Sequence, residues 1–212
     1  LQEGLGLNVV DDRIYVVQRG ELSELIDLDG DKVCDRVRTV SQGWGMSGNY
    51  HEFAFGLPVD ADGNFFVGTN VGFWNPEWWH GLSKVPYRGW ILKISPEGLV
   101  TPYAKGARGP AGMGFDTDGQ LYYTDNQGDW LPVCGLFPVE EGAFFGHPAS
   151  LRWTEAYGFG EQVPATEVEP TEARTDPAVW IPYEWSQSTG NLVAVQTGGG
   201  FGPFAGQLFV AE

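Results

Sequence analysis

The chain contains a histidine beside a glutamate, His51 and Glu52, immediately before a pattern that predicts a strand, a turn and a second strand. A neutral imidazole can remove a proton from a hydroxyl group, and a neighbouring carboxylate can orient the ring. His51 and Glu52 are therefore candidate catalytic residues. The alternative is a histidine that backbone groups hold in place where a strand begins.

Two oxygen-rich stretches are candidate calcium sites, because calcium prefers carboxylate and carbonyl oxygens. Residues 124–130, directly after a predicted strand, combine carboxylate and amide oxygens and form the first candidate site. In an acidic loop, carboxylates at positions 1, 3, 5 and 9 and one backbone carbonyl are supplied by Asp27, Asp29, Asp31, Asp35 and Val33. The alternative in both places is a turn held by its own side-chain hydrogen bonds. In the acidic loop Arg38 stands where an EF-hand has its glutamate.

Aromatic side chains are concentrated in residues 72–81, where Trp78, Trp79 and His80 are candidate substrate contacts. Flat indole faces suit a sugar ring or a planar cofactor, although such residues also pack long loops onto a fold. The three histidines of the chain are too scattered in the sequence to indicate a zinc site.

A repeat indicates the elements that would position these residues. Residues 59–67 and residues 115–123, 56 positions later, share one pattern: apolar, Asp, small, Asp, Gly, polar and three apolar residues. Asp-Gly between apolar runs predicts a β-hairpin, since glycine accepts a positive φ. Residues 7–17 resemble a weaker copy, and residues 206–211 resemble the second strand of another.

A recurrence of about 50 residues with several short strands in each unit predicts the blades of a β-propeller. We expect an all-β chain, with residues 1–212 forming one propeller domain of about four blades. Because an open ring leaves unpaired sheet edges, we expect it to be incomplete at both ends, with the missing blades supplied by the same or another chain. Residues at about 155–179 are rich in Pro, Glu and Thr and predict an insertion.

Composition limits the partners. A net charge of −16 would repel nucleic acid, and no apolar run approaches the roughly 20 residues needed to cross a membrane. We therefore expect neither nucleic-acid binding nor membrane insertion. The chain has 31 Gly, 14 Pro and 9 Trp, which favours short strands and tight turns over long helices. Cys34 and Cys134 could form a disulfide or remain as two buried thiols.

Several short motifs resemble a known family. In chain order they are His51, residues 62–67, residues 108–115, residues 125–128 and residues 142–148. Their order resembles the glucose/sorbosone dehydrogenase family, six-bladed propellers best known for soluble quinoproteins that use pyrroloquinoline quinone and calcium. The resemblance spans about residues 5–212. It is closest to uncharacterised, membrane-bound dehydrogenase propellers of planctomycete-type bacteria, which are often fused to cytochrome c modules.

The resemblance implies a six-bladed fold and the oxidation of a carbohydrate or polyol by a periplasmic or extracellular protein, with cytochrome c as a possible electron acceptor. It implies that His51 is the base. The residues that it places near cofactor, substrate and calcium are Arg108, Asn126, Gln127, His147, Gly128 and Asp129.

The sequence departs from this family at one motif. It reads Arg108-Gly109-Pro110-Ala111-Gly112 where the family has Arg-Asn-Pro-Gln-Gly, so two amides are missing. The basic residues that hold the quinone carboxylates would come from later blades. Two other functions remain open: a non-catalytic, calcium-stabilised propeller that binds glycans or partner proteins, and a polysaccharide hydrolase or lyase.

Overall fold

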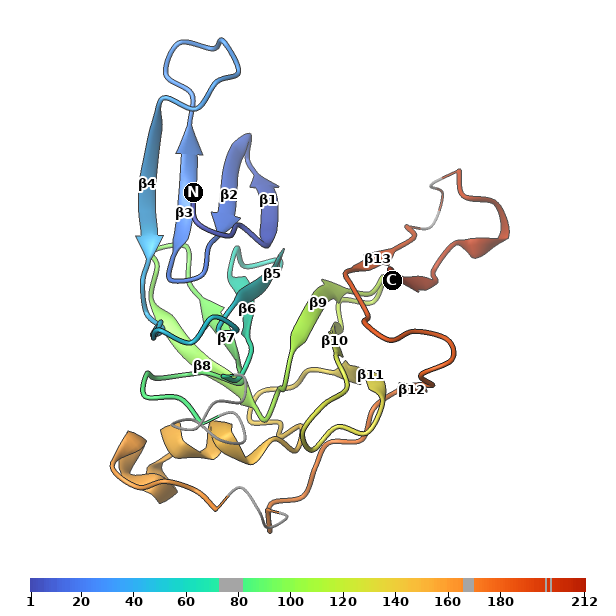
Figure 1. Cartoon of the computed structure of the whole chain (residues 1–212). Helices are drawn as coiled ribbons and strands as arrows, with labels where there is room; N and C mark the ends of the chain where they lie inside the picture. The colour runs from blue at the N-terminus through green and yellow to red at the C-terminus, as the bar shows by residue number, and fades with distance from the viewer. Residues whose placement is uncertain (73–81, 166–169, 197, 199) are drawn as a thin grey trace.

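The computed structural model describes residues 1–72, 82–165, 170–196, 198 and 200–212. In these residues, three four-stranded antiparallel sheets are followed by a two-stranded sheet (Figure 1). The strands of the first sheet are β1 Gly6–Val10, β2 Arg13–Val17, β3 Leu22–Ile26 and β4 Arg36–Ser41. Those of the second are β5 Ala54–Val59, β6 Phe65–Thr69, β7 Trp90–Ile94 and β8 Val100–Lys105.

The third sheet contains β9 Pro110–Phe115, β10 Leu121–Asp125, β11 Cys134–Pro138 and β12 Val179–Ile181, and the last contains β13 Leu192–Ala194 and β14 Leu208–Val210. Among the described residues, three 3₁₀ helices lie outside the sheets: η2 Pro148–Trp153, η3 Glu155–Gly160 and η4 Gly202–Phe204. No helix in the described part of the chain is long and apolar enough to cross a membrane.

The first strands of the four sheets, β1, β5, β9 and β13, lie beside one another in turn, which is the arrangement of propeller blades around an axis. Their close approach requires glycine. A Cβ on Gly6 would lie 1.7 Å from the carbonyl oxygen of Gly56, and one on Gly112 would lie 2.0 Å from that of Gly190. The all-β, partial-propeller prediction is therefore confirmed, with three full blades and the first hairpin of a fourth in the described residues.

The repeated hairpin is present in the second and third blades. Asp60 and Asp116 begin the two turns, and the Oδ1 of each accepts the backbone N–H groups two and four positions later. Gly63 and Gly119 have φ values of 83° and 85°, which a residue with a Cβ rarely adopts. The weaker copy forms the β1–β2 hairpin, and residues 206–211 include β14.

The core lies between adjacent blades, because successive residues of a strand point to opposite faces. In β6, Phe65 and Val67 pack against the first blade together with Tyr15 and Leu22. Phe66 points the other way and belongs to a separate cluster with the third blade. Each blade is thus covered by its neighbours.

The third blade is interrupted between β11 and β12. This segment contains η2 and η3, and it includes the Pro/Glu/Thr-rich residues expected to form an insertion, up to the start of β12 at Val179. Lys105 on β8 forms an ion pair of 2.7 Å with Glu172, and Thr175 donates its N–H to the Phe144 carbonyl at 2.7 Å. The described part of the segment therefore folds back onto the second and third blades.

The cysteines differ from both expectations. Cys34 is exposed in the β3–β4 turn, whereas Cys134 is buried at the start of β11, and both are free thiols. They lie in different blades, so neither a disulfide nor a pair of buried thiols describes them.

Candidate functional site

Five loop segments meet at one end of the blades, which we call the mouth: residues 49–53, 70–72, 107–109, 126–131 and 189–191. Each segment either precedes the first strand of a blade or follows its second strand. Pairing of Ala54 with Thr69 and of Pro110 with Asp125 brings these ends together within each blade. Between blades, the Val71 N–H donates to the Arg108 carbonyl at 3.1 Å. Loops far apart in the sequence thus share one opening.

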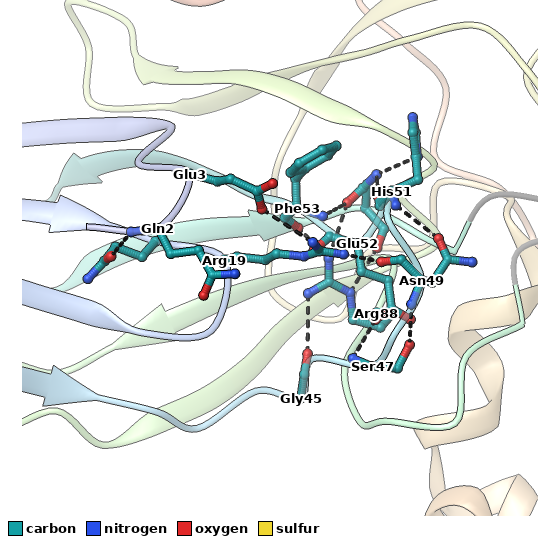
Figure 2. Close-up of polar contacts among 12 residues, drawn as sticks. Gln2, Glu3, Arg19, Gly45, Ser47, Asn49, His51, Glu52, Phe53 and Arg88 are labelled. Atoms are coloured by element: carbon teal, nitrogen blue, oxygen red, sulfur yellow. Dashed lines mark hydrogen bonds and ion pairs between the residues drawn. The ribbon is translucent and has the colours of Figure 1, made fainter.

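His51 lies in the mouth of the second blade and is half-buried. Its Nδ1 is 2.9 Å from the side-chain nitrogen of Asn70, and its backbone N–H donates to Asn49 Oδ1 at 3.0 Å (Figure 2). Burial lowers the pKa of the His51 imidazole, and the positive charge of Arg108 lowers it further. The shift favours the neutral imidazole, which is the form that can accept a proton.

Glu52 is adjacent in sequence but points elsewhere. Its side chain is fully buried, and its carboxylate accepts the Ser47 N–H at 2.7 Å and the Ser83 hydroxyl at 2.5 Å. The group against the His51 ring is Asn70 instead of Glu52. The repeat could have identified Asn70, since the 56-residue offset aligns it with Asn126, which the sequence did single out.

Asp125 organises the corresponding loop of the third blade. Its buried carboxylate accepts the backbone N–H groups of Arg108 at 2.9 Å and Gly109 at 2.6 Å, and the Tyr123 hydroxyl at 3.0 Å. Burial raises the pKa of the Asp125 carboxyl group to about 6, although the hydrogen bonds from Arg108 and Gly109 oppose this effect. Sequence reasoning included Asp125 in the oxygen-rich stretch of residues 124–130 but did not single it out as a residue that holds the loop.

Arg108 and the loop after β10 are in direct contact. A Cβ on Gly128 would lie 2.3 Å from Arg108 Nε, so only glycine lets the guanidinium pack on this loop. The N–H and carbonyl groups of Gly128 exchange hydrogen bonds with Leu131, which closes a tight turn. Asn126 Oδ1 accepts the Thr189 hydroxyl at 3.1 Å and so links the third blade to the fourth.

The remaining candidates of this loop have weaker ties. The Gln127 N–H lies 3.4 Å from Cys134 Sγ. Asp129 lines a small cavity with Arg108, Asp125 and His147. The loop therefore brings a carboxylate, amides and one guanidinium into a single region of the mouth.

His147 caps a helix. It is 2% exposed, and its Nδ1 accepts the Ala149 N–H at the start of η2 at 3.2 Å. Its backbone N–H donates to the Gly106 carbonyl at 3.0 Å, which anchors η2 beneath the mouth. The other candidate substrate contacts, Trp78, Trp79 and His80, lie outside the described residues.

The acidic loop forms the β3–β4 turn, and the antiparallel order places it at the end of the first blade opposite to the mouth. Carboxylate oxygens of Asp27, Asp29 and Asp35 lie within 4.8 Å of one another, and this is the one such group of His, Cys, Asp and Glu side chains among the described residues. Asp31 Oδ1 instead accepts the Val33 N–H at 2.8 Å. The carboxylates also accept N–H groups within the loop. Backbone N–H groups lower the pKa of Asp27, most of all that of Lys32.

Together, the radial sheets and the shared mouth define a partial β-propeller. A glucose dehydrogenase structure superposes with a TM-score of 0.66 at 17% identity, covering 99% of this chain and 66% of that one. The soluble aldose sugar dehydrogenase of Escherichia coli gives a TM-score of 0.60 at 16% identity, covering 96% and 59%. The expected resemblance to glucose/sorbosone dehydrogenases is thus confirmed for the fold.

A family model described as a domain of unknown function, DUF7133, matches residues 1–183, and the chain belongs to this family. A member of carbohydrate-active enzyme family AA12 from Trichoderma reesei is also similar, with a TM-score of 0.53 at 18% identity, covering 68% of this chain and 43% of that one. No curated protein matched the chain in sequence. The chain spans just under two thirds of the glucose dehydrogenase with which it superposes.

Proposed function

We propose that this chain is part of a dehydrogenase-like propeller that oxidises a carbohydrate or a polyol. The observation that carries the proposal is the shared mouth, where the neutral imidazole of His51 and the guanidinium of Arg108 lie near enough for the charge to lower the histidine pKa. An imidazole beside a cation is suited to a substrate hydroxyl that meets an anionic cofactor. The fold of the sugar dehydrogenases supports the same substrate class.

The donor set fits a quinone in part. Pyrroloquinoline quinone, when bound, would supply a two-electron acceptor for the oxidation. Arg108 would face one of its carboxylates, and the amides of Asn126 and Gln127 would bind its carbonyl groups. Arg108 is one cation against several carboxylates, so the other cations would come from blades beyond this chain. His51 would contact the reacting hydroxyl.

Calcium would have two places in this proposal. In the mouth, the Asp129 carboxylate and the Gly128 carbonyl would bind the catalytic ion, whose charge would polarise a bound oxygen. In the β3–β4 turn, the clustered oxygens of Asp27, Asp29 and Asp35 would hold a structural ion, together with Asp31 and the Val33 carbonyl after a local rearrangement. A periplasmic or extracellular location and a cytochrome c acceptor belong to the same proposal.

The redox assignment is tested with the complete protein, pyrroloquinoline quinone and calcium, by reduction of a dye with a panel of sugars and polyols. We expect activity that falls at least about 100-fold in His51→Ala, since removing a preorganised side chain that contacts the reacting oxygen typically costs this much. The control is Leu99→Ala, an exposed residue 70% accessible in the β7–β8 turn. An equal rate in both variants would remove His51 from the reaction. Product formed without an electron acceptor would indicate hydrolysis or elimination.

The structural calcium has its own test. Addition of calcium to chelator-treated protein should raise the Tm, because an ion that binds only the folded state stabilises it. Asp29→Asn should reduce the shift, and Asp12→Asn, an exposed acid outside the cluster, should not. An unchanged Tm with and without chelator would show that the acidic loop is a plain turn.

A further inference from the structure

Arg88 determines how the polar groups around His51 are oriented. Its side chain is fully buried, and burial lowers the pKa of Arg88 to about 10, so it remains charged at neutral pH. It donates from Nε to the Asn70 carbonyl at 3.0 Å and from Nη2 to Asn70 Oδ1 at 3.1 Å. A guanidinium has donors only, so the atom of the Asn70 side chain that faces it must be the oxygen.

A second donor fixes the same orientation of Asn70. The backbone N–H of Phe53 donates to Asn70 Oδ1 at 2.5 Å. The side-chain nitrogen of Asn70 is thereby turned toward His51, where it donates to the backbone carbonyl and lies 2.9 Å from Nδ1 of the ring (Figure 2). An amide NH₂ has donors only, so Nδ1 must accept and cannot carry the proton of a neutral ring.

The charges around the ring favour its neutral form. Arg108, Arg88 and Arg19 each lower the pKa of His51, in addition to its burial. A hydrogen bond with the backbone of Val71 has the opposite effect. Because the Val71 N–H donates to the Arg108 carbonyl, the backbone group of Val71 that raises the histidine pKa is its carbonyl. Its presence agrees with a proton on the nitrogen that does not face Asn70.

From these contacts we propose that Asn70, oriented by Arg88, fixes His51 as the neutral tautomer with its proton on Nε2. In this state Nε2 is a hydrogen-bond donor and has no lone pair with which to accept a hydroxyl proton. A substrate or product oxygen would then meet Nε2–H as a donor by taking the place of the Val71 carbonyl. It becomes a base only if the proton moves to Nδ1, where the NH₂ group of Asn70 opposes it. Asn70 is thus a positioning residue that selects between binding and proton transfer.

The tautomer can be measured directly on the complete protein with ¹⁵N-labelled histidine. Long-range ¹H–¹⁵N correlation spectra distinguish protonated from unprotonated ring nitrogens. The sequence has only three histidines, so His51→Gln assigns the signal. Between pH 6 and 8 we expect Nε2 protonated and Nδ1 unprotonated. A proton on Nδ1, or a doubly protonated ring at pH 7, would overturn the proposal without any variant.

Asn70→Asp reverses the polarity that we infer. A carboxylate can keep the contacts with Arg88 and Phe53 while its second oxygen accepts from Nδ1, so we expect the proton to appear on Nδ1 and the histidine pKa to rise by about one unit or more. Asn49→Asp is the matched control: it adds the same charge beside the His51 backbone, and the Nε2–H tautomer should persist. An unchanged tautomer in Asn70→Asp would contradict the proposal. A variant that fails to fold leaves the wild-type spectrum as the deciding measurement.

This inference depends on the proposed function only for the nature of the ligand, and the two can fail separately. If no sugar is oxidised but Nε2 carries the proton, the tautomer assignment stands and the redox function falls. If the wild type oxidises sugars and Nδ1 carries the proton, the function stands and the role of Asn70 falls. If Asn70→Asp gains oxidation rate, both are supported.

Discussion

The mouth loops of the second and third blades share one backbone conformation, but side chains of different charge hold it in place. The Asn70 N–H donates to the Phe53 carbonyl at 3.4 Å, and 56 residues later the Asn126 N–H donates to the Gly109 carbonyl at 3.2 Å. In the second blade a neutral amide side chain accepts the Phe53 N–H and is itself held by a buried cation. In the third blade a buried carboxylate, Asp125, accepts the equivalent Gly109 N–H.

Because of this difference, the two blades present different functional groups at the mouth. In the second blade, the charged group is the buried guanidinium of Arg88. It orients the neutral side-chain amide of Asn70, whose nitrogen then faces His51. In the third blade, Asp125 holds the backbone of Arg108, while the guanidinium packs over Gly128 toward the mouth. One blade therefore presents a neutral imidazole and the next presents a cation. The repeated hairpin places both loops at the mouth. The side chain that accepts the loop N–H group, Asn70 or Asp125, determines which functional group the blade presents.

Removing the cation behind the second loop should have the largest effect. Arg88→Met leaves the carbonyls of Asn70 and Gly45 without their charged donor and removes a buried positive charge that interacts with the buried Glu52. We expect a loss of about 3–5 kcal/mol in the free energy of unfolding, as for other broken buried charge networks. Urea denaturation measures it.

The control for this variant is Arg13→Met. Arg13 pairs with Glu24 at 2.5 Å, but its side chain is 50% exposed, so its loss should cost less than about 1 kcal/mol. Equal costs for the two variants would mean that Arg88 does not organise the second mouth, and the contrast with the third blade would disappear.

The carboxylate of the third blade should make stability depend on pH. The pKa of Asp125 rises from 3.8 to about 6 on folding, so its contribution to stability is full below about pH 4 and is lost as the pH rises through about 6. The full difference is about 3 kcal/mol by linkage. The destabilisation caused by Asp125→Asn should therefore be larger at pH 4 than at pH 7.5. Thermal unfolding of both proteins across this range measures the difference.

Asp60 in the second blade provides the opposite sign. Although burial opposes the shift, hydrogen bonds from the side chain and backbone of Asn64 lower the pKa of Asp60. Its contribution is therefore present above the unfolded pKa and is lost as the pH falls. Asp60→Asn should cost less at low pH than at neutral pH. A pH trend of the same sign in both variants would show that the two carboxylates do not differ as the structure indicates.

Local patterns were sufficient to predict the scaffold. An Asp-Gly turn between apolar runs is specified by residues within ten positions, and the alternation of Phe65, Phe66 and Val67 requires cover on both faces of the blade. The radial arrangement of such hairpins in turn predicts that His51 and the oxygen-rich loop with Asp129, which belong to different blades, share one opening. The propeller and the location of the mouth are thus features that short-range sequence can encode.

The hydrogen-bond network inside the site could not be predicted in the same way. His51 lies in a turn before β5, and the adjacent Glu52 points inward to the Ser47 N–H and the Ser83 hydroxyl, partners that adjacency in the sequence does not reveal. Arg88 follows a stretch with no periodic pattern, and its burial contradicts the usual exposure of arginine. Most of its hydrogen bonds go to backbone carbonyls, those of Asn70, Gly45 and Phe53, which the sequence does not distinguish from others. The orientation of the Asn70 side-chain amide depends on Arg88, so it could not be predicted from the sequence either.

Two glycines test the smallest expected difference between the second and third blades. Gly128 and Gly72 occupy the same position of the repeat. A Cβ on Gly128 would meet Arg108 at 2.3 Å, whereas one on Gly72 would meet the Asn49 side chain at 3.3 Å. Gly128→Ala should therefore cost about 1–3 kcal/mol, the usual range for overpacking, and Gly72→Ala less.

Denaturant unfolding of the two alanine variants measures this difference, and it also locates the guanidinium. If the alanine at position 128 displaces Arg108, the histidine of the second blade loses a nearby positive charge, and its pKa should rise toward the ordinary value. The alanine at position 72 should leave this pKa unchanged. Equal stabilities together with an unchanged histidine pKa would mean that Arg108 does not rest on the third loop, and the cation would no longer distinguish one blade from the other.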